Sequence, residues 1–110
     1  MSDSFEERRK RAEERWAHDN ELRFKVLARR DGLLGRWAAA ELGLKGPQME
    51  AYAKGVVDAE FGKNGEMEIL KKIRTDFDAG KCAHTDHAIR AQMDACLKLA
   101  AEQIMSETKK

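Results

Sequence analysis

The side chains best suited to chemistry gather in one short stretch of the chain. They form a Cys-x-His-x-x-His pattern with an added carboxylate, and they are Cys82, His84, Asp86 and His87. Thiolate and imidazole groups are the ligands that zinc prefers in proteins. A structural zinc site takes four ligands, usually from two such pairs, and only Cys96 and His18 remain elsewhere. We therefore interpret the stretch as a loop leading into a helix cap and expect no metal site.

Sequence motifs for covalent or phosphoryl-transfer catalysis are missing. The chain has no Gly-x-Ser-x-Gly turn, no glycine-rich phosphate loop and no His-Glu-x-x-His pattern. Cys96 falls on the apolar stripe of an expected helix, which is typical of a buried cysteine. Cys82 has no evident base beyond His84. Because no set of catalytic side chains is concentrated in these 110 residues, we do not expect an enzyme.

A run of basic residues, Arg8 to Arg11, raises the question of nucleic-acid binding. The whole chain carries 21 basic and 20 acidic residues, and glutamates flank the run on both sides. A nucleic-acid-binding domain normally shows a clear basic excess. We therefore expect a solvated charged surface and no nucleic-acid partner. The rival interpretation, a helical nucleic-acid binder that also uses Arg29 and Arg30, is the less favoured one.

The first 19 residues combine a high density of charge with isolated bulky side chains. Phe5, Ala12 and Trp16 are spaced by seven and four residues, which places them on one narrow stripe of a helix. Acidic residues precede basic ones at helical spacing, as Glu6 precedes Arg9, and this favours a helix. The stripe is too narrow to anchor to a core, so we predict a mobile, helix-prone arm over residues 1–19. Both a partner-binding segment and a plain extension of the first helix fit this pattern.

Residues 20–110 have the composition and the spacing of a helical domain. Alanine occurs sixteen times and leucine nine times, whereas valine, isoleucine and threonine together occur ten times, which favours helix over strand. Apolar residues recur at helical intervals over residues 22–42, 47–61, 66–79 and 85–105. Since each stretch has one apolar face to bury, the sequence predicts an all-α fold, a small four-helix bundle.

Several finer expectations follow from the same spacing. We expect Phe24, Ala40, Phe61 and Met67 to belong to the apolar faces that pack in the core. Glycine at positions 43 and 80 is expected to end the first and third helices, and Pro47 to begin the second. Glycine at positions 32 and 35 permits a close helix approach or a bend. Residues 106–110 are expected to fray.

The sequence also bears on the compartment. The longest unbroken apolar run is four residues, far short of the about 20 that a membrane-spanning helix needs. The opening residues lack the apolar segment and small-residue cleavage site of an export signal. We therefore expect a cytoplasmic protein with reduced cysteines and no direct membrane insertion.

Four blocks of the sequence resemble a known family. Residues 16–25 read Trp-Ala-His-Asp-x-Glu-Leu-Arg-Phe-Lys, and residues 28–39 read Ala-Arg-Arg-x-x-Leu-Leu-Gly-x-Trp-Ala-Ala. Together with Ala-Tyr-Ala-Lys-x-Val-Val at 51–57 and Asp-His-x-Ile-Arg-x-x-Met at 86–93, they resemble the zeta subunit of the alphaproteobacterial F-type ATP synthase. The resemblance covers nearly the whole chain in order. The chain departs from the family at Trp16, where another aromatic residue is usual, and at residues 81–84.

The resemblance implies a natural inhibitor of ATP hydrolysis by the synthase. In that family the N-terminal segment is mobile when free and becomes helical inside a catalytic alpha/beta interface of the soluble sector. The bundle then rests against the outside of that sector and the central stalk, and rotation in the hydrolysis direction is blocked. The implied partners are the alpha, beta and central-stalk subunits. The implied location is the cytoplasmic face of the inner membrane, with the free protein monomeric.

Carried over by position, the inhibitory segment is about residues 2–19. The bulky residues of the arm would fill apolar pockets of the partner, and its arginines would pair with carboxylates. His18 lies at the hinge, where it could make inhibition pH-dependent, although a capping role beside Asp19 is favoured. The candidate partner-binding residues are Phe5, Arg8, Arg9, Arg11, Ala12, Glu13, Glu14, Arg15, Trp16, His18 and Asp19.

The family is also associated with weak purine-nucleotide binding by the bundle. The resemblance therefore implies weak binding of ATP or ADP at a place that the sequence does not identify, and no other cofactor is expected. This leaves an alternative function, a nucleotide-binding or sensing helical module that regulates through its bundle.

Overall fold

A computed structural model describes residues 18–62 and 65–108, and these residues form four α-helices. The helices are α2 (Asn20–Glu41), α3 (Pro47–Glu60), α4 (Gly65–Ala79) and α5 (Asp86–Thr108). No strand occurs in either described range. The all-α fold with four helices is therefore confirmed. Of the predicted arm, residues 1–17 lie outside the described part of the chain.

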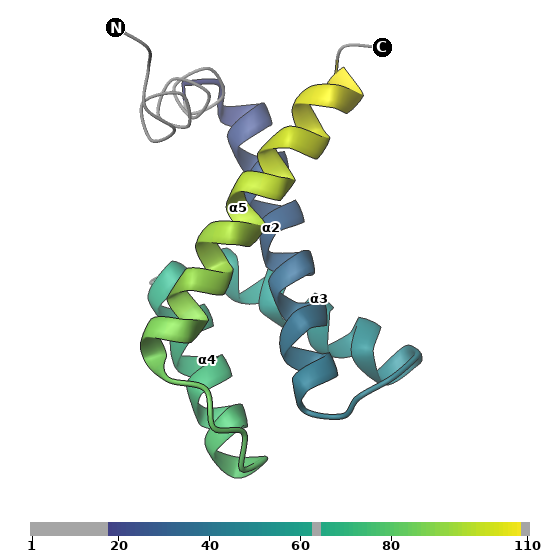
Figure 1. Cartoon of the computed structure of the whole chain (residues 1–110). Coiled ribbons are helices and arrows are strands. Elements are labelled where there is room, and N and C mark those ends of the chain that lie inside the picture. Colours follow the sequence, from purple (N-terminus) through teal and green to yellow (C-terminus); the bar gives the residue numbers. More distant parts are fainter. Residues whose placement is uncertain (1–17, 63–64, 109–110) are drawn as a thin grey trace, which may run out of the picture.

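The helices contact one another in a ring. α2 packs against both α3 and α5, and α4 lies between α3 and α5 (Figure 1). α2 and α5 are the longest helices, with 22 and 23 residues, and they cross and extend together beyond the shorter pair (Figure 1). α2 therefore connects the start of the described chain to the centre of the bundle.

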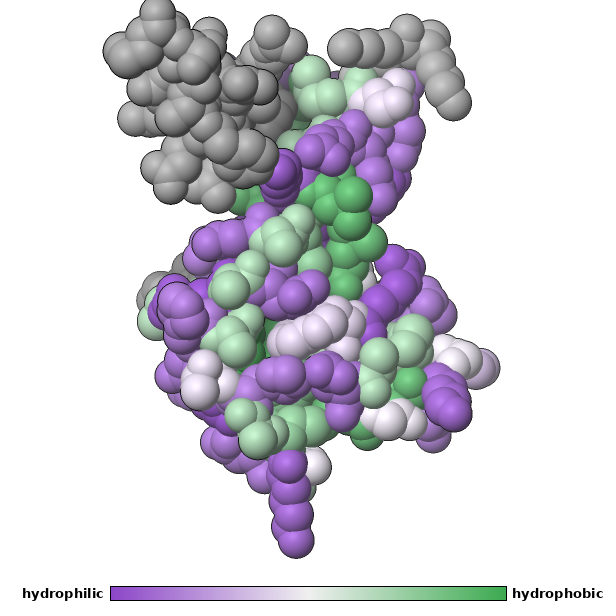
Figure 2. Space-filling view, in the orientation of Figure 1, coloured by the Kyte–Doolittle hydropathy of each residue, from purple (hydrophilic) through white to green (hydrophobic). Residues whose placement is uncertain are grey.

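The core consists of two apolar clusters. The larger one joins all four helices through Leu34, Ala38, Val56, Ile69, Ile73, Phe77, Ile89, Met93 and Cys96. The smaller one pairs α2 with α5 through Val26, Ala100 and Ile104. Figure 2 shows hydrophobic side chains gathering where α2 and α5 extend beyond the other helices, while hydrophilic ones cover most of the remaining visible face. Each large apolar side chain buried in this way stabilises the fold by about 1.5–3 kcal/mol.

The end of α2 follows the predicted glycine signal. Gly43 adopts a φ of 81°, the left-handed region in which other residues are strained. Its N–H donates to Ala40 O at 3.0 Å, and Leu44 N–H donates to Ala39 O at 2.9 Å. This pair of hydrogen bonds is the Schellman arrangement that satisfies the last carbonyls of a helix. Pro47 then occupies the first turn of α3, as expected.

The end of α4 differs from the prediction in one detail. The helix does end at Ala79, but the residue with the left-handed backbone is Lys81, at a φ of 58°, and Cys82 N–H donates to Phe77 O at 2.8 Å. Gly80 packs closely against α2 instead, because a Cβ atom there would lie 2.8 Å from Leu42 Cδ2. The glycine lets the loop after α4 pass against the end of α2.

Four residues expected in the core lie on the surface. Ala40 is exposed, and Phe24, Phe61 and Met67 are 56%, 55% and 63% exposed. α2 is contacted from two sides, by α3 and α5, and its buried face includes Leu34, Ala38 and Ala39. α3 ends at Glu60, so Phe61 lies beyond it and stacks on Phe24 with ring centroids 5.0 Å apart.

The expected fraying of residues 106–110 is wrong for most of that segment. α5 continues to Thr108, because Arg29 of α2 donates to Glu107 Oε2 and to Gln103 Oε1, both at 2.8 Å. Contacts between distant parts of the chain thus hold the last turns of α5. Within the two described ranges, no helix has the length and apolar character needed to cross a bilayer.

Candidate functional site

The arm joins the bundle at His18 and Asp19. Asp19 is the N-cap of α2, and its Oδ1 accepts a hydrogen bond from Leu22 N–H at 3.1 Å. Glu21 in the first turn favours the positive end of the helix dipole. His18 is exposed and precedes the cap. The capping role predicted at this position therefore belongs to the Asp19 side chain.

The remaining nine predicted partner-binding residues lie outside the described residues. They are Phe5, Arg8, Arg9, Arg11, Ala12, Glu13, Glu14, Arg15 and Trp16. The structure therefore describes only α2, the helix that follows these residues in the chain. α2 is fixed to α5 by Arg29 and to α3 by Arg36, whose Nε donates to Glu50 Oε2 at 3.1 Å.

Two of the residues first considered as metal ligands, Cys82 and His84, contact the C-terminal end of α2. Cys82 Sγ lies 3.2 Å from Glu41 O, and His84 Nε2 lies 2.6 Å from Glu41 Oε1. The His84 ring is in contact with the rings of Trp37 and Phe77, at centroid distances of 5.2 and 5.3 Å. Across the described part of the chain, no three histidine, cysteine or acidic side chains are placed to hold a metal ion.

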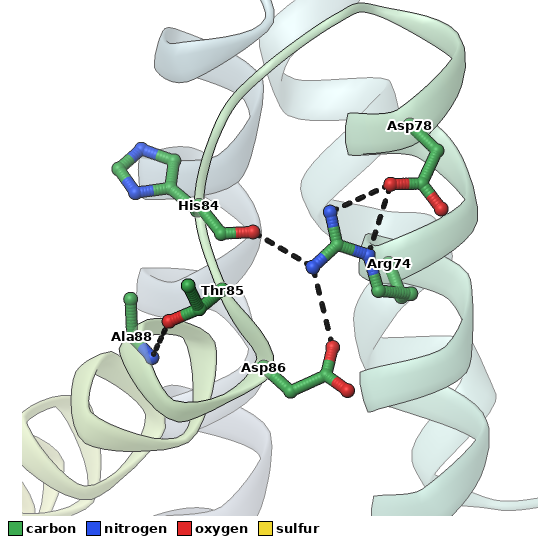
Figure 3. A network of polar contacts seen from close by, with 6 residues as sticks. All are labelled: Arg74, Asp78, His84, Thr85, Asp86 and Ala88. Carbon is green, nitrogen blue, oxygen red and sulfur yellow. Dashed lines mark hydrogen bonds and ion pairs between the residues drawn. The ribbon is translucent and has the colours of Figure 1, made fainter.

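Arg74 organises the loop between α4 and α5 (Figure 3). Its Nη1 donates to His84 O at 2.7 Å and to Asp86 Oδ1 at 3.2 Å, and its Nη2 donates to Asp78 Oδ1 at 2.7 Å. The His84 ring points away from Arg74, toward the other side of the loop (Figure 3). Thr85 Oγ1 accepts from Ala88 N–H at 3.1 Å, so Thr85 caps the N-terminus of α5.

A surface cavity of about 390 Å³ lies between α4 and α5. Its apolar lining comes from Met67, Leu70 and Ile89, and its basic lining from Lys71, Arg74 and Arg90, with Glu68 and Asp86 adding negative charge. Arg74 is engaged in the loop network, whereas no described residue pairs with Lys71 or Arg90. The sequence analysis missed this cavity, although Lys71 and Arg74 are three residues apart and so share a helix face.

The sequence analysis also missed a group of charged side chains in the core. Arg30 is 4% exposed and Asp31 is fully buried. Arg30 Nε donates to Asp31 Oδ1 at 2.9 Å, and Arg30 Nη2 donates to Glu60 Oε1 at 2.7 Å. Desolvation, followed by a hydrogen bond with Glu60, raises the pKa of Asp31 from 3.8 to about 8. The spacing could have indicated a buried Arg30, because it lies four residues after Val26 and four before Leu34, and both of these are fully buried.

Comparison with protein families identifies the chain. The profile of the ATPase inhibitor subunit zeta matches residues 1–103, which include the arm, α2, α3, α4 and most of α5. The comparison with curated proteins finds no match. The family match agrees with the resemblance seen in the four sequence blocks. The chain therefore belongs to the ATPase inhibitor subunit zeta family.

Proposed function

We propose that this protein inhibits ATP hydrolysis by the F-type ATP synthase, through insertion of its N-terminal segment into a catalytic alpha/beta interface. The inserted segment blocks rotation in the hydrolysis direction, and rotation in the synthesis direction expels it. The observation that carries the proposal is the match to an ATPase inhibitor subunit family, which begins at residue 1 and so includes the whole arm. The protein itself performs no chemistry.

The structure supports this mechanism by attaching the arm to a well-packed helix. Asp19, the last residue of the arm, is the N-cap of α2, which packs against both α3 and α5. Ordering a segment costs about 1–2 kcal/mol per residue, so well-buried anchors must offset this loss. Phe5 and Trp16 are the bulky residues that fill this role in the proposal.

The stacked rings of Phe24 and Phe61 form a second contact with the partner in this proposal. Both rings are more than half exposed, and together they form an apolar spot on the surface of the bundle. Phe24 follows the Asp19 cap by five residues, a rise of about 7.5 Å along α2. An arm inserted up to Asp19 brings this pair to the partner's surface. The partners are the alpha, beta and central-stalk subunits at the cytoplasmic face of the inner membrane.

The test measures ATP hydrolysis by the isolated soluble sector of the synthase with added inhibitor. Full-length protein is compared with a chain of residues 18–110, which keeps Asp19 and therefore the cap of α2. We expect the full chain to inhibit and the shortened chain to lose inhibition while keeping its helical circular dichroism spectrum. Equal inhibition by both chains would show that the arm is not the effector.

The cavity between α4 and α5 favours a second function, binding of a purine nucleotide by the bundle. Its apolar lining suits a base, and Lys71 and Arg90 are free to pair with phosphate. NMR titration with ADP is expected to shift amide signals of α4 and α5 around the cavity. Lys71→Glu should weaken the shifts, whereas Lys54→Glu on exposed α3 surface should leave them unchanged. Shifts confined to other helices would contradict this site.

A further inference from the structure

The charged group in the core has more negative than positive charge. Three carboxylates surround the Arg30 guanidinium: Asp31 at 2.9 Å, Glu60 at 2.7 Å and Glu66 at 4.0 Å. The Asp31 side chain is fully buried, and those of Arg30 and Glu60 are 5% and 16% exposed. Water therefore solvates the charges of these three side chains only weakly. A buried charge without a partner is strongly unfavourable, and the usual response is a change of protonation.

One oxygen atom of this group lacks a donor. Asp31 Oδ1 accepts from Arg30 Nε, but Asp31 Oδ2 is buried and, among the described residues, has no hydrogen-bond partner if the carboxyl is ionised. Glu60 binds the same guanidinium, since Arg30 Nη2 donates to Glu60 Oε1 at 2.7 Å, and Glu60 is among the causes that raise the pKa of Asp31. Two ionised carboxylates only accept hydrogen bonds, so neither can satisfy the other. A single proton between them would supply the missing donor.

We propose that Asp31 carries a proton in the folded protein and donates it through Oδ2 to Glu60, so that a one-proton carboxyl pair ties α2 to α3. Glu60 remains ionised and accepts from both Asp31 and Arg30. The pair then carries one negative charge, which Arg30 balances. Deprotonation at alkaline pH places two negative charges at the junction of α2 and α3 and loosens it.

The electrostatic surroundings of Asp31 agree with this assignment. Burial is the largest cause of its raised pKa and the hydrogen bond with Glu60 is the second, while the positive charge of Arg30 lowers it. α4 contributes Glu66, which faces Arg30, and α5 contributes Cys96. Burial raises the pKa of the Cys96 thiol, which keeps it protonated at neutral pH. Each of the four helices thus presents a titratable group to this site.

The sign of the pH dependence follows from the raised pKa. Between the unfolded value of 3.8 and the folded value of about 8, the folded state holds a proton that the unfolded state has released. The stabilisation is complete below pH 3.8 and is lost as the pH rises toward 8. In that window this group raises the unfolding equilibrium constant by up to about tenfold per pH unit.

The first experiment measures the proton directly. Carboxyl ¹³C NMR of the full-length protein follows the ionisation of Asp31 from about pH 4, close to the ordinary aspartate pKa, to about pH 9, above the raised one. We expect Asp31 to remain protonated at pH 7. In Glu60→Gln the amide donates to Asp31 in place of the proton, so Asp31 should ionise at lower pH. Glu66→Gln is the matched control, because Glu66 is 58% exposed and lies 4.0 Å from Arg30 Nη1. This variant should change the pH at which Asp31 ionises only slightly.

The second experiment compares the stability of the wild type and Asp31→Asn from about pH 5 to pH 7, where an ordinary cysteine stays protonated. The asparagine amide can accept from Arg30 through its oxygen and donate to Glu60 through its NH₂ group, and it does not titrate. We expect the unfolding constant of the wild type to rise with pH relative to that of the variant. Parallel profiles of the two proteins, or an Asp31 carboxyl that is already ionised at pH 6, would overturn the proposal. The NMR result is decisive even if the variant fails to fold.

Discussion

Gly35 of α2 and Ala53 of α3 approach so closely that a Cβ atom added to Gly35 would lie 2.6 Å from the Cα atom of Ala53. The added atom would also lie 3.3 Å from Val56 Cβ. The backbones of α2 and α3 are therefore in direct contact at this point. Neither helix can accommodate a larger residue there without separating from the other.

We predict that Gly35→Ala destabilises the protein, because overpacking costs about 1–3 kcal/mol and exceeds the about 1 kcal/mol that alanine gains over glycine in a helix. Gly32→Ala is the matched control on the same helix. A Cβ atom at Gly32 meets Arg36 Nη1 only at 3.6 Å, an ordinary contact, so this variant should be slightly more stable than the wild type. Denaturant unfolding measures both, and equal effects would contradict the close approach.

The N-cap at Asp19 is expected to stabilise the first turn of α2, where the arm joins the bundle. Asp19→Ala removes the acceptor for Leu22 N–H and should cost about 0.5–2 kcal/mol of helix stability, whereas Asp19→Ser should retain most of it. Hydrogen exchange of the Leu22 amide is the sensitive measurement. Unchanged exchange in Asp19→Ala would show that the cap does not hold the start of α2.

The single tyrosine of the chain offers a spectroscopic test of the contact between α3 and α4. Tyr52 donates to Asp76 Oδ2 at 2.7 Å, and Lys72 Nζ lies 4.6 Å from the centre of its ring. Burial, followed by the hydrogen bond with Asp76, raises the pKa of Tyr52 above its usual value of 10. The stabilisation from this tyrosine is therefore present below pH 10 and lost as the pH rises through the folded pKa.

An alkaline titration followed by the tyrosinate absorbance should show ionisation only together with unfolding. A reversible titration near pH 10 in the folded state would contradict the buried hydrogen bond, since 10 is the unperturbed value. Tyr52→Phe should lower stability by about 1.5–3 kcal/mol, the range for a hydrogen bond to a charged group.

The proposed inhibition predicts a strong effect of one residue in the arm. Trp16→Ala should raise the half-inhibitory concentration about tenfold, the order expected for the loss of one interface anchor. Trp16→Phe keeps an aromatic ring and should retain most of the inhibition. The readout is ATP hydrolysis by the soluble sector, with circular dichroism to check the fold. An unchanged value for Trp16→Ala would remove this residue from the interface.

The helix content and the turns could be predicted from the sequence because they depend on local physics. Helical spacing of apolar residues placed α3 and α5 within a few residues of their observed bounds, and Gly43 and Pro47 marked the turn between α2 and α3. The affiliation with the zeta family was also legible, since it depends on residue order alone.

The tertiary structure decided which faces are buried, because burial depends on how many neighbours a helix has. A helix contacted from two sides buries a wider face than one apolar stripe indicates, so Arg30 and Asp31 are enclosed while Phe24 is exposed. Position relative to other helices likewise decided that His84 contacts Glu41 and that Lys71 and Arg90 line one cavity. The charge pair of Arg30 and Glu60, which are 30 residues apart in the chain, depends on a distance that local sequence does not set.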